Sequence, residues 1–185
     1  MNYKFGILLF IITAVTFSSC KKDKTVIPNE EEVITTLNYT LTPVGGGTAV
    51  TMTFRDVDGD GGADPVITGG VLAANTTYTG AMELLNETES PAEDVTEEIE
   101  EEDADHQFFF STTVNGLSVS YTDQDDDGNP VGLKTEVSTT GTGTGEMTII
   151  LRHEPNKSGA GVSGGNIANA GGETDIEVTF DVDVQ

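Results

Sequence analysis

The C-terminal end of the chain reads Asp175-Ile176-Glu177-Val178-Thr179-Phe180-Asp181-Val182-Asp183-Val184. Polar and apolar residues alternate through this whole stretch, which is the pattern of a β-strand with one buried and one exposed face. The even-numbered residues should point into a core, and the odd-numbered ones, Asp175 included, should point into water. The stretch therefore predicts a sheet that packs on one side against another layer.

The same period of two recurs from Val33 onward. Apolar residues alternate with polar ones at Val33–Leu41, Val50–Phe54, Tyr78–Leu84, Phe108–Phe110, Leu117–Tyr121, Val131–Val137 and Met147–Leu151. Between two of these runs, Asn115-Gly116 predicts a tight β-hairpin. About seven to nine short strands at even spacing indicate an all-β chain, folded as a sandwich or a barrel. We expect a single antiparallel β-sandwich of the immunoglobulin-like kind over residues 33–185.

One segment departs from the strand pattern and predicts a short acidic helix near residues 91–103. Ser90 is placed as its N-cap, with Pro91 in the first turn and Glu93 completing a capping box. Val95 and Ile99, four residues apart, would dock it on the sheet. Acidic residues crowd its C-terminal end, where the helix dipole disfavours them, so fraying is expected near Glu100. This helix is either a solvated connection or a docking face for a basic partner.

The overall charge limits the classes of partner. The 185 residues include 32 Asp and Glu but 8 Lys and Arg, which gives a formal net charge of −24. Phosphate backbones would repel such a chain, so nucleic acid is not an expected partner. The expected binding partners are metal cations, or a basic protein or glycan. The chain is expected to be a monomer.

The N-terminus predicts lipid anchoring. Residues 1–19 carry a basic start, a short apolar run and small residues, which together are typical of a signal peptide. The motif Phe17-Ser18-Ser19-Cys20 resembles a bacterial lipobox, and Cys20 is the single cysteine of the chain. We therefore expect Cys20 to carry acyl chains such as palmitate, residues 20–32 to form a flexible tether, and the outer membrane to be the site of attachment. An uncleaved anchor or a buried core helix is the alternative, and the domain could face the periplasm or the cell surface.

Two Asp-rich loops are candidate calcium sites. Asp56-Val57-Asp58-Gly59-Asp60-Gly61 and Asp123-Gln124-Asp125-Asp126-Asp127-Gly128 both fit the first half of the calcium-loop signature D-x-D-x-D-G. Alternate carboxylates in a tight turn converge on one point, and Ca²⁺ prefers oxygen ligands. The bidentate Glu of an EF-hand is missing, so plain turns are the alternative reading. The predicted ligands are Asp56, Asp58, Asp60, Asp64, Asp123, Asp125 and Asp127.

No motif makes a case for an enzyme. Gly159-Ala160-Gly161-Val162-Ser163-Gly164 fits G-x-G-x-x-G, but no helix pattern follows it, so we interpret residues 155–172 as a long mobile loop. The two histidines, His106 and His153, have no partners that the sequence places beside them. We therefore expect no catalytic residues.

Four blocks carry a family resemblance that spans nearly the whole mature chain: Asn29–Thr36, Asp56–Gly62, Leu85–Glu89 and Gly172–Val178. They resemble a Bacteroidota lipoprotein family whose members often bear the label type 1 periplasmic binding fold. That label denotes a two-domain α/β sensor of small molecules, and the chain has no βαβ pattern to match it. The resemblance implies an envelope lipoprotein. Its acidic sandwich is expected to be a non-catalytic binding or adhesion module supported by calcium, and a lipocalin-like barrel carrying a small ligand is the alternative.

Overall fold

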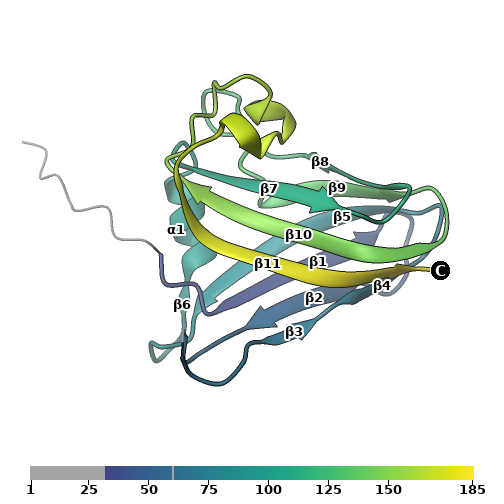
Figure 1. Ribbon diagram of the computed structural model, residues 1–185, viewed down its shortest axis with the longest axis horizontal. Coiled ribbons are helices and arrows are strands. Elements are labelled where there is room, and N and C mark those ends of the chain that lie inside the picture. Colours follow the sequence, from purple (N-terminus) through teal and green to yellow (C-terminus); the bar gives the residue numbers. More distant parts are fainter. Residues whose placement is uncertain (1–31, 60) are drawn as a thin grey trace, which may run out of the picture. The chain divides into compact units, whose positions relative to one another are not determined.

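The computed structural model describes residues 32–59 and 61–185. Two β-sheets lie face to face and enclose one core (Figure 1). The predicted signal peptide, Cys20, the predicted tether up to residue 31, and Asp60 lie outside the described residues. In the part of the chain that is described, no helix has the length and apolar character needed to cross a membrane.

The larger sheet, sheet A, has the strand order β3-β2-β1-β5-β9-β8, and β6 pairs with β5. Neighbouring strands of this sheet run in opposite directions throughout. The strands are β1 (Thr36–Pro43), β2 (Val50–Arg55), β3 (Val66–Thr68), β5 (Thr77–Asn86), β6 (Glu93–Asp94), β8 (Leu117–Tyr121) and β9 (Lys134–Thr139).

The smaller sheet, sheet B, has the order β4-β11-β10-β7. Its strands are β4 (Gly70–Leu72), β7 (His106–Thr112), β10 (Gly143–His153) and β11 (Glu173–Val184). The pairing of β4 with β11 is parallel, while the other two pairings are antiparallel. The chain thus passes from sheet A at β3 to sheet B at β4 through Gly69 alone.

Alternating residues of both sheets fill the space between them. The residues from Ile176 to Val184 that were expected to point inward are buried, which confirms the pattern of the last strand. Tyr39 and Phe180 are fully buried from opposite sheets, and Phe108 joins them. The described strands form two open sheets and no closed barrel, so the lipocalin-like alternative is wrong. A closed barrel would need hydrogen bonds between the edge strands of the two sheets.

The strand count and one predicted hairpin differ from the sequence-based expectation. Three strands of two or three residues, β3, β4 and β6, bring the number in the described chain to eleven; the eight longer ones match the expected seven to nine. Asn115-Gly116 does not close a hairpin, because β7 pairs with β10 in sheet B and β8 pairs with β9 in sheet A. The turn carries the chain across from one sheet to the other.

The one α-helix among the described residues begins later than predicted. Helix α1 spans Val95–Glu101, and its N-cap is Asp94, whose side chain accepts a hydrogen bond from the Thr96 amide. Ser90 is therefore not the cap, because Glu93 and Asp94 first pair with β5 as strand β6. Val95 and Ile99 are buried as expected and hold the helix on the core.

The Gly-rich segment 155–172 packs on the outer face of sheet B rather than forming an open loop. It contains two 3-10 turns, η1 (Val162–Gly164) and η2 (Ile167–Asn169). Val162 and Ala170 are buried against Phe109, which points away from the main core. A small second core therefore holds this segment in place.

Candidate metal centre

Two histidines meet at one end of sheet B. His106 is the first residue of β7 and His153 is the last residue of β10, and the antiparallel register places them directly opposite each other. Their ring centroids are 4.4 Å apart. Both side chains are buried, His106 with 0% and His153 with 3% of its surface exposed.

A β-bulge adds Asp175 from the next strand. On β11, Ile176 faces Leu151 and Thr174 faces Arg152, so Asp175 is the extra residue of the pair of strands. Bulges re-aim side chains, and the Asp175 side chain has no exposed surface. The expectation that Asp175 points into water is thus wrong, because strict alternation does not continue through the bulge.

Glu32 completes the cluster from the segment that precedes β1. Its Oε1 lies 2.9 Å from His106 Nε2, and its Oε2 lies 3.4 Å from His153 Nδ1. Asp175 Oδ1 lies 3.8 Å from the same His153 nitrogen. One ligand atom from each of these four residues lies within 4.8 Å of all the others. We call these residues, Glu32, His106, His153 and Asp175, the histidine–carboxylate cluster.

The end of α1 fixes the orientation of His106. Its Nδ1 lies 3.1 Å from the carbonyl oxygen of Glu102, the C-cap residue of the helix. A carbonyl only accepts, so Nδ1 carries the hydrogen, and the other ring nitrogen, Nε2, faces Glu32. A neutral imidazole would therefore direct a lone pair at a carboxylate oxygen. The geometry calls for a positive charge between them, supplied by a second proton or by a metal ion.

The electrostatic environment of the cluster favours charge on both partners. Burial alone would raise the pKa of Glu32, but the hydrogen bond with His106, a backbone hydrogen bond and the charges of His106 and His153 together outweigh burial and lower it. Burial alone would likewise lower the pKa of His106, but the contacts with Glu32 and with the Glu102 carbonyl raise it. Two imidazoles and two carboxylates in a buried site are a donor set that could hold a metal ion.

The first Asp loop lies between β2 and β3. Asp56 Oδ1 accepts a hydrogen bond of 2.9 Å from the Gly59 amide, and Asp58 Oδ2 accepts one of 3.0 Å from Ala63. The Ala63 amide lowers the pKa of Asp58. Asp64 is exposed, and Asp60 lies outside the described residues. The loop is a tight turn in which a backbone amide holds one oxygen of each of the Asp56 and Asp58 carboxylates.

In the second Asp loop, between β8 and β9, one carboxylate pairs with a lysine from another segment of the chain. Asp125 is buried, and its Oδ2 lies 3.0 Å from the ammonium of Lys157 in the Gly-rich segment. Its Oδ1 accepts hydrogen bonds from the amides of Asp127 and Asn129. The Asp123 carboxylate accepts hydrogen bonds from the backbone amides of Gly132 and Lys134. Asp127 is exposed.

The two Asp loops do not come together. Both leave the same end of sheet A, but β1, β5 and β9 lie between β2 and β8. At about 4.8 Å per strand, four steps separate the loops by roughly 19 Å. They cannot share one ion, and the predicted calcium ligands therefore form two separate groups.

The sequence analysis missed the histidine–carboxylate cluster. Its members are far apart in the chain, and only the register of β7, β10 and β11 brings three of them into one row. One signal was present: His106 and His153 occupy inward positions, two residues from the core residues Phe108 and Leu151. A histidine on the apolar face of a strand marks a polar site within a core.

Comparisons with known proteins give no family. No family model matches the chain, and no curated protein sequence matches it. Among solved structures, domains 4 and 5 of the S-layer protein SbsC align with 79% of this chain and 75% of that chain, at 14% sequence identity. The TM-score of that alignment, 0.26, is too low for it to inform the fold or the function.

Proposed function

We propose that this chain is a lipid-anchored envelope protein whose acidic β-sandwich is a non-catalytic binding module. Cys20 would carry the lipid, and residues 20–31 would link it to the sandwich. The attachment is to the outer membrane, with the sandwich binding a basic partner at its surface.

The filled interior of the sandwich is the observation that carries this proposal. Large side chains from both sheets, including Tyr39, Phe108 and Phe180, have no exposed surface and occupy the space between the sheets. A carrier of a small apolar ligand needs an internal cavity. Binding is therefore assigned to the outside of the molecule.

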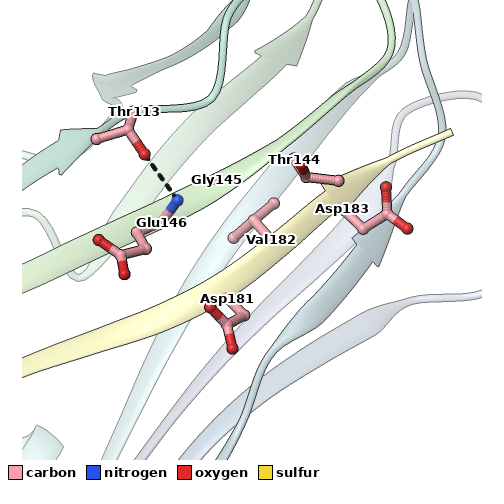
Figure 2. A pocket seen from close by; sticks show the side chains of 7 residues that line it. All are labelled: Thr113, Thr144, Gly145, Glu146, Asp181, Val182 and Asp183. Atoms are coloured by element: carbon pink, nitrogen blue, oxygen red, sulfur yellow. Dashed lines mark hydrogen bonds between the residues drawn. The ribbon is translucent and has the colours of Figure 1, made fainter.

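The outer face of sheet B offers a surface of suitable charge. A hollow of about 470 Å³ there is lined by Glu146, Asp181 and Asp183 together with Thr113, Thr144, Gly145 and Val182 (Figure 2). Glu146 and Asp181 are directly opposite each other on β10 and β11. Like charges at such a cross-strand position repel, and a bound basic group would relieve that repulsion.

Membrane partitioning tests the anchoring. The full chain should enter the detergent phase and incorporate a labelled palmitate analogue in a bacterial host, whereas Cys20→Ala should do neither. Ser19→Ala, which keeps the cysteine and a small residue before it, is the control and should behave as the parent. Equal partitioning of the parent and Cys20→Ala would show that Cys20 is not the anchor.

Binding to a lysine-rich peptide tests the surface. The triple variant Glu146→Gln, Asp181→Asn and Asp183→Asn should bind the peptide about tenfold more weakly, a loss of about 1.4 kcal/mol. The matched control neutralises three exposed carboxylates elsewhere, Glu97, Glu101 and Asp126, and so has the same net charge. If both triple variants lose the same affinity, the peptide responds to net charge and the hollow is not a binding surface.

Calcium remains a prediction, and we assign it to the β2–β3 loop. The carboxylates of Asp56 and Asp58 are bound by backbone amides and by no cation of the described chain, whereas Asp125 is paired with the ammonium of Lys157. Added Ca²⁺ should raise the melting temperature of the parent, and Asp58→Asn should abolish the rise. An unchanged melting temperature in the parent would contradict calcium binding by this loop.

A further inference from the structure

The histidine–carboxylate cluster has the features of a preformed metal-binding site. We propose that Glu32, His106, His153 and Asp175 bind one divalent first-row transition metal ion, of the Zn²⁺ class, which fastens the start of the domain to sheet B. This site is distinct from both Asp loops, and its occupation does not depend on the lipid anchor.

The donor atoms select the class of metal. Ca²⁺ and Mg²⁺ prefer oxygen ligands throughout, whereas imidazole nitrogen suits Zn²⁺ and its neighbours in the first row. The cluster offers two imidazole nitrogens and two carboxylates, and four protein ligands are typical of structural zinc sites. A divalent ion would also neutralise two carboxylates while both imidazoles stay uncharged.

Buried polar atoms directed into the cluster provide independent support. His153 Nδ1 and Glu32 Oε2 are buried and have no hydrogen-bond partner among the described residues. Their side chains are only 3% and 5% exposed. A buried polar atom without a partner destabilises the folded state, and metal ligation is one way to satisfy it.

The distances are those of a site close to its liganded form. Metal–ligand bonds of about 2.0–2.2 Å place neighbouring ligand atoms of a tetrahedral site roughly 3.4 Å apart. His153 Nδ1 and Glu32 Oε2 are already 3.4 Å apart. The widest separation in the cluster is no more than 4.8 Å, so a contraction of at most about 1.4 Å would close it on an ion.

The contact on the other side of the His106 ring is also typical of a metal ligand. Metal-bound histidines usually donate their other ring N–H to a carbonyl or a carboxylate, which fixes the tautomer. His106 Nδ1 faces the Glu102 carbonyl at 3.1 Å in this way. The end of α1 thereby orients the ring, and Nε2 is left for the ion.

The site joins parts of the chain that lie far apart in sequence. Glu32 leads directly into β1 of sheet A, while the other three ligands belong to β7, β10 and β11 of sheet B. One ion would therefore cross-link the two sheets and hold residue 32 against the sandwich. The consequence is a domain whose first residues are ordered by metal.

Metal titration of the full chain tests the proposal. The protein is first treated with a chelator and returned to metal-free buffer, and Zn²⁺ or Ca²⁺ is then added in calorimetry and in thermal melts. We expect one Zn²⁺ per chain and a higher melting temperature with Zn²⁺, and we expect Asp58→Asn to bind Zn²⁺ as the parent does. Co²⁺ should give the visible absorption bands of a tetrahedral site.

Two variants make the outcome decisive. Glu32→Gln keeps the size of the side chain and lies outside every strand, so it should fold as the parent does but bind Zn²⁺ at least about tenfold more weakly. His153→Gln should lose the Co²⁺ bands. Absence of Zn²⁺ binding by the parent, or unchanged binding by Glu32→Gln, would overturn the site and leave the cluster a proton-bridged ion pair. Neither result would affect the partitioning test of Cys20.

Discussion

Lys157 and Asp125 form an ion pair in which both side chains are almost completely buried, at 5% and 2% exposure. Removal of one partner leaves an uncompensated charge in the interior, which costs about 3–5 kcal/mol. Asp125→Asn should therefore lower the free energy of unfolding in urea by about that amount. Asp126→Asn, one residue further on and exposed, is the control and should change it by less than about 0.5 kcal/mol. Equal effects of the two variants would contradict a buried pair.

The same ion pair should make the free energy of unfolding depend on pH. Burial favours the neutral form of Asp125, but the hydrogen bonds from Lys157 and Asn129 outweigh burial and lower its pKa. A carboxyl with a lowered pKa in the folded state stabilises the protein above the pKa of the unfolded chain, and this contribution is lost as the pH falls. The difference in unfolding free energy between the parent and Asp125→Asn should thus have its largest value near pH 6. It should decrease below about pH 3.9. A difference that is constant down to pH 2 would rule out this origin.

A hydrogen bond between two core side chains leaves no room for a Cβ at Gly80. Tyr39 Oη lies 2.6 Å from Thr135 Oγ1, and a Cβ at position 80 would lie 2.7 Å from that same Tyr39 oxygen. Gly80→Ala should therefore cost about 1–3 kcal/mol, as overpacked core positions do. Gly141→Ala, where a Cβ would meet no atom within 4 Å, is the matched control. Urea unfolding of both variants measures the difference, and equal stabilities would contradict the predicted clash.

At the level of elements, helix α1 allows a comparison between two proposed caps. Asp94 accepts the Thr96 amide at 3.0 Å, while Ser90 lies before strand β6. Asp94→Ala should destabilise the protein by about 1 kcal/mol, and Ser90→Ala should have little effect. Thermal unfolding of the two variants measures this difference. A larger loss for Ser90→Ala would mean that the helix begins earlier in solution.

The elements also show which features a sequence pattern can predict. The alternation from Ile176 to Val184 gave the last strand correctly, because burial on one face is a local property of a strand. Asn115-Gly116 gave the wrong pairing, because turn residues define a bend but not the sheet in which the next strand lies. Sequence periodicity also could not anticipate the bulge at Asp175, since a bulge is defined by the neighbouring strand.

The candidate site was harder to predict than the fold for a related reason. The Asp loops are contiguous in sequence and fit a motif, so they were recognised, whereas the cation beside Asp125 comes from Lys157 in a different segment. His106 and His153 become neighbours only through the pairing of β7 with β10. Sites assembled from strands depend on register, which a single sequence does not reveal.

For the whole molecule, the net charge of −24 predicts that the melting temperature depends on the salt concentration. Self-repulsion destabilises a compact state, and about 0.15 M salt screens charges beyond roughly 8 Å. Raising NaCl from low concentration to this level should increase the melting temperature by a few degrees, since about 1 kcal/mol corresponds to roughly 2–4 °C in a domain of this size. KCl should act equally. A lower melting temperature in salt would show that attractive ion pairs dominate.

The position of Glu32 has a mechanical consequence. Glu32 lies beside Asp175 near the start of β11, while Gln185 follows the far end of that strand, about 40 Å away for 12 residues. A pull between the two ends of the domain therefore runs along β1 and β11 in opposite directions. Since β1 is hydrogen-bonded on both sides, to β2 and to β5, its bonds are loaded together in shear rather than opened one by one. Such an arrangement should resist mechanical unfolding by a load applied between residues 32 and 185.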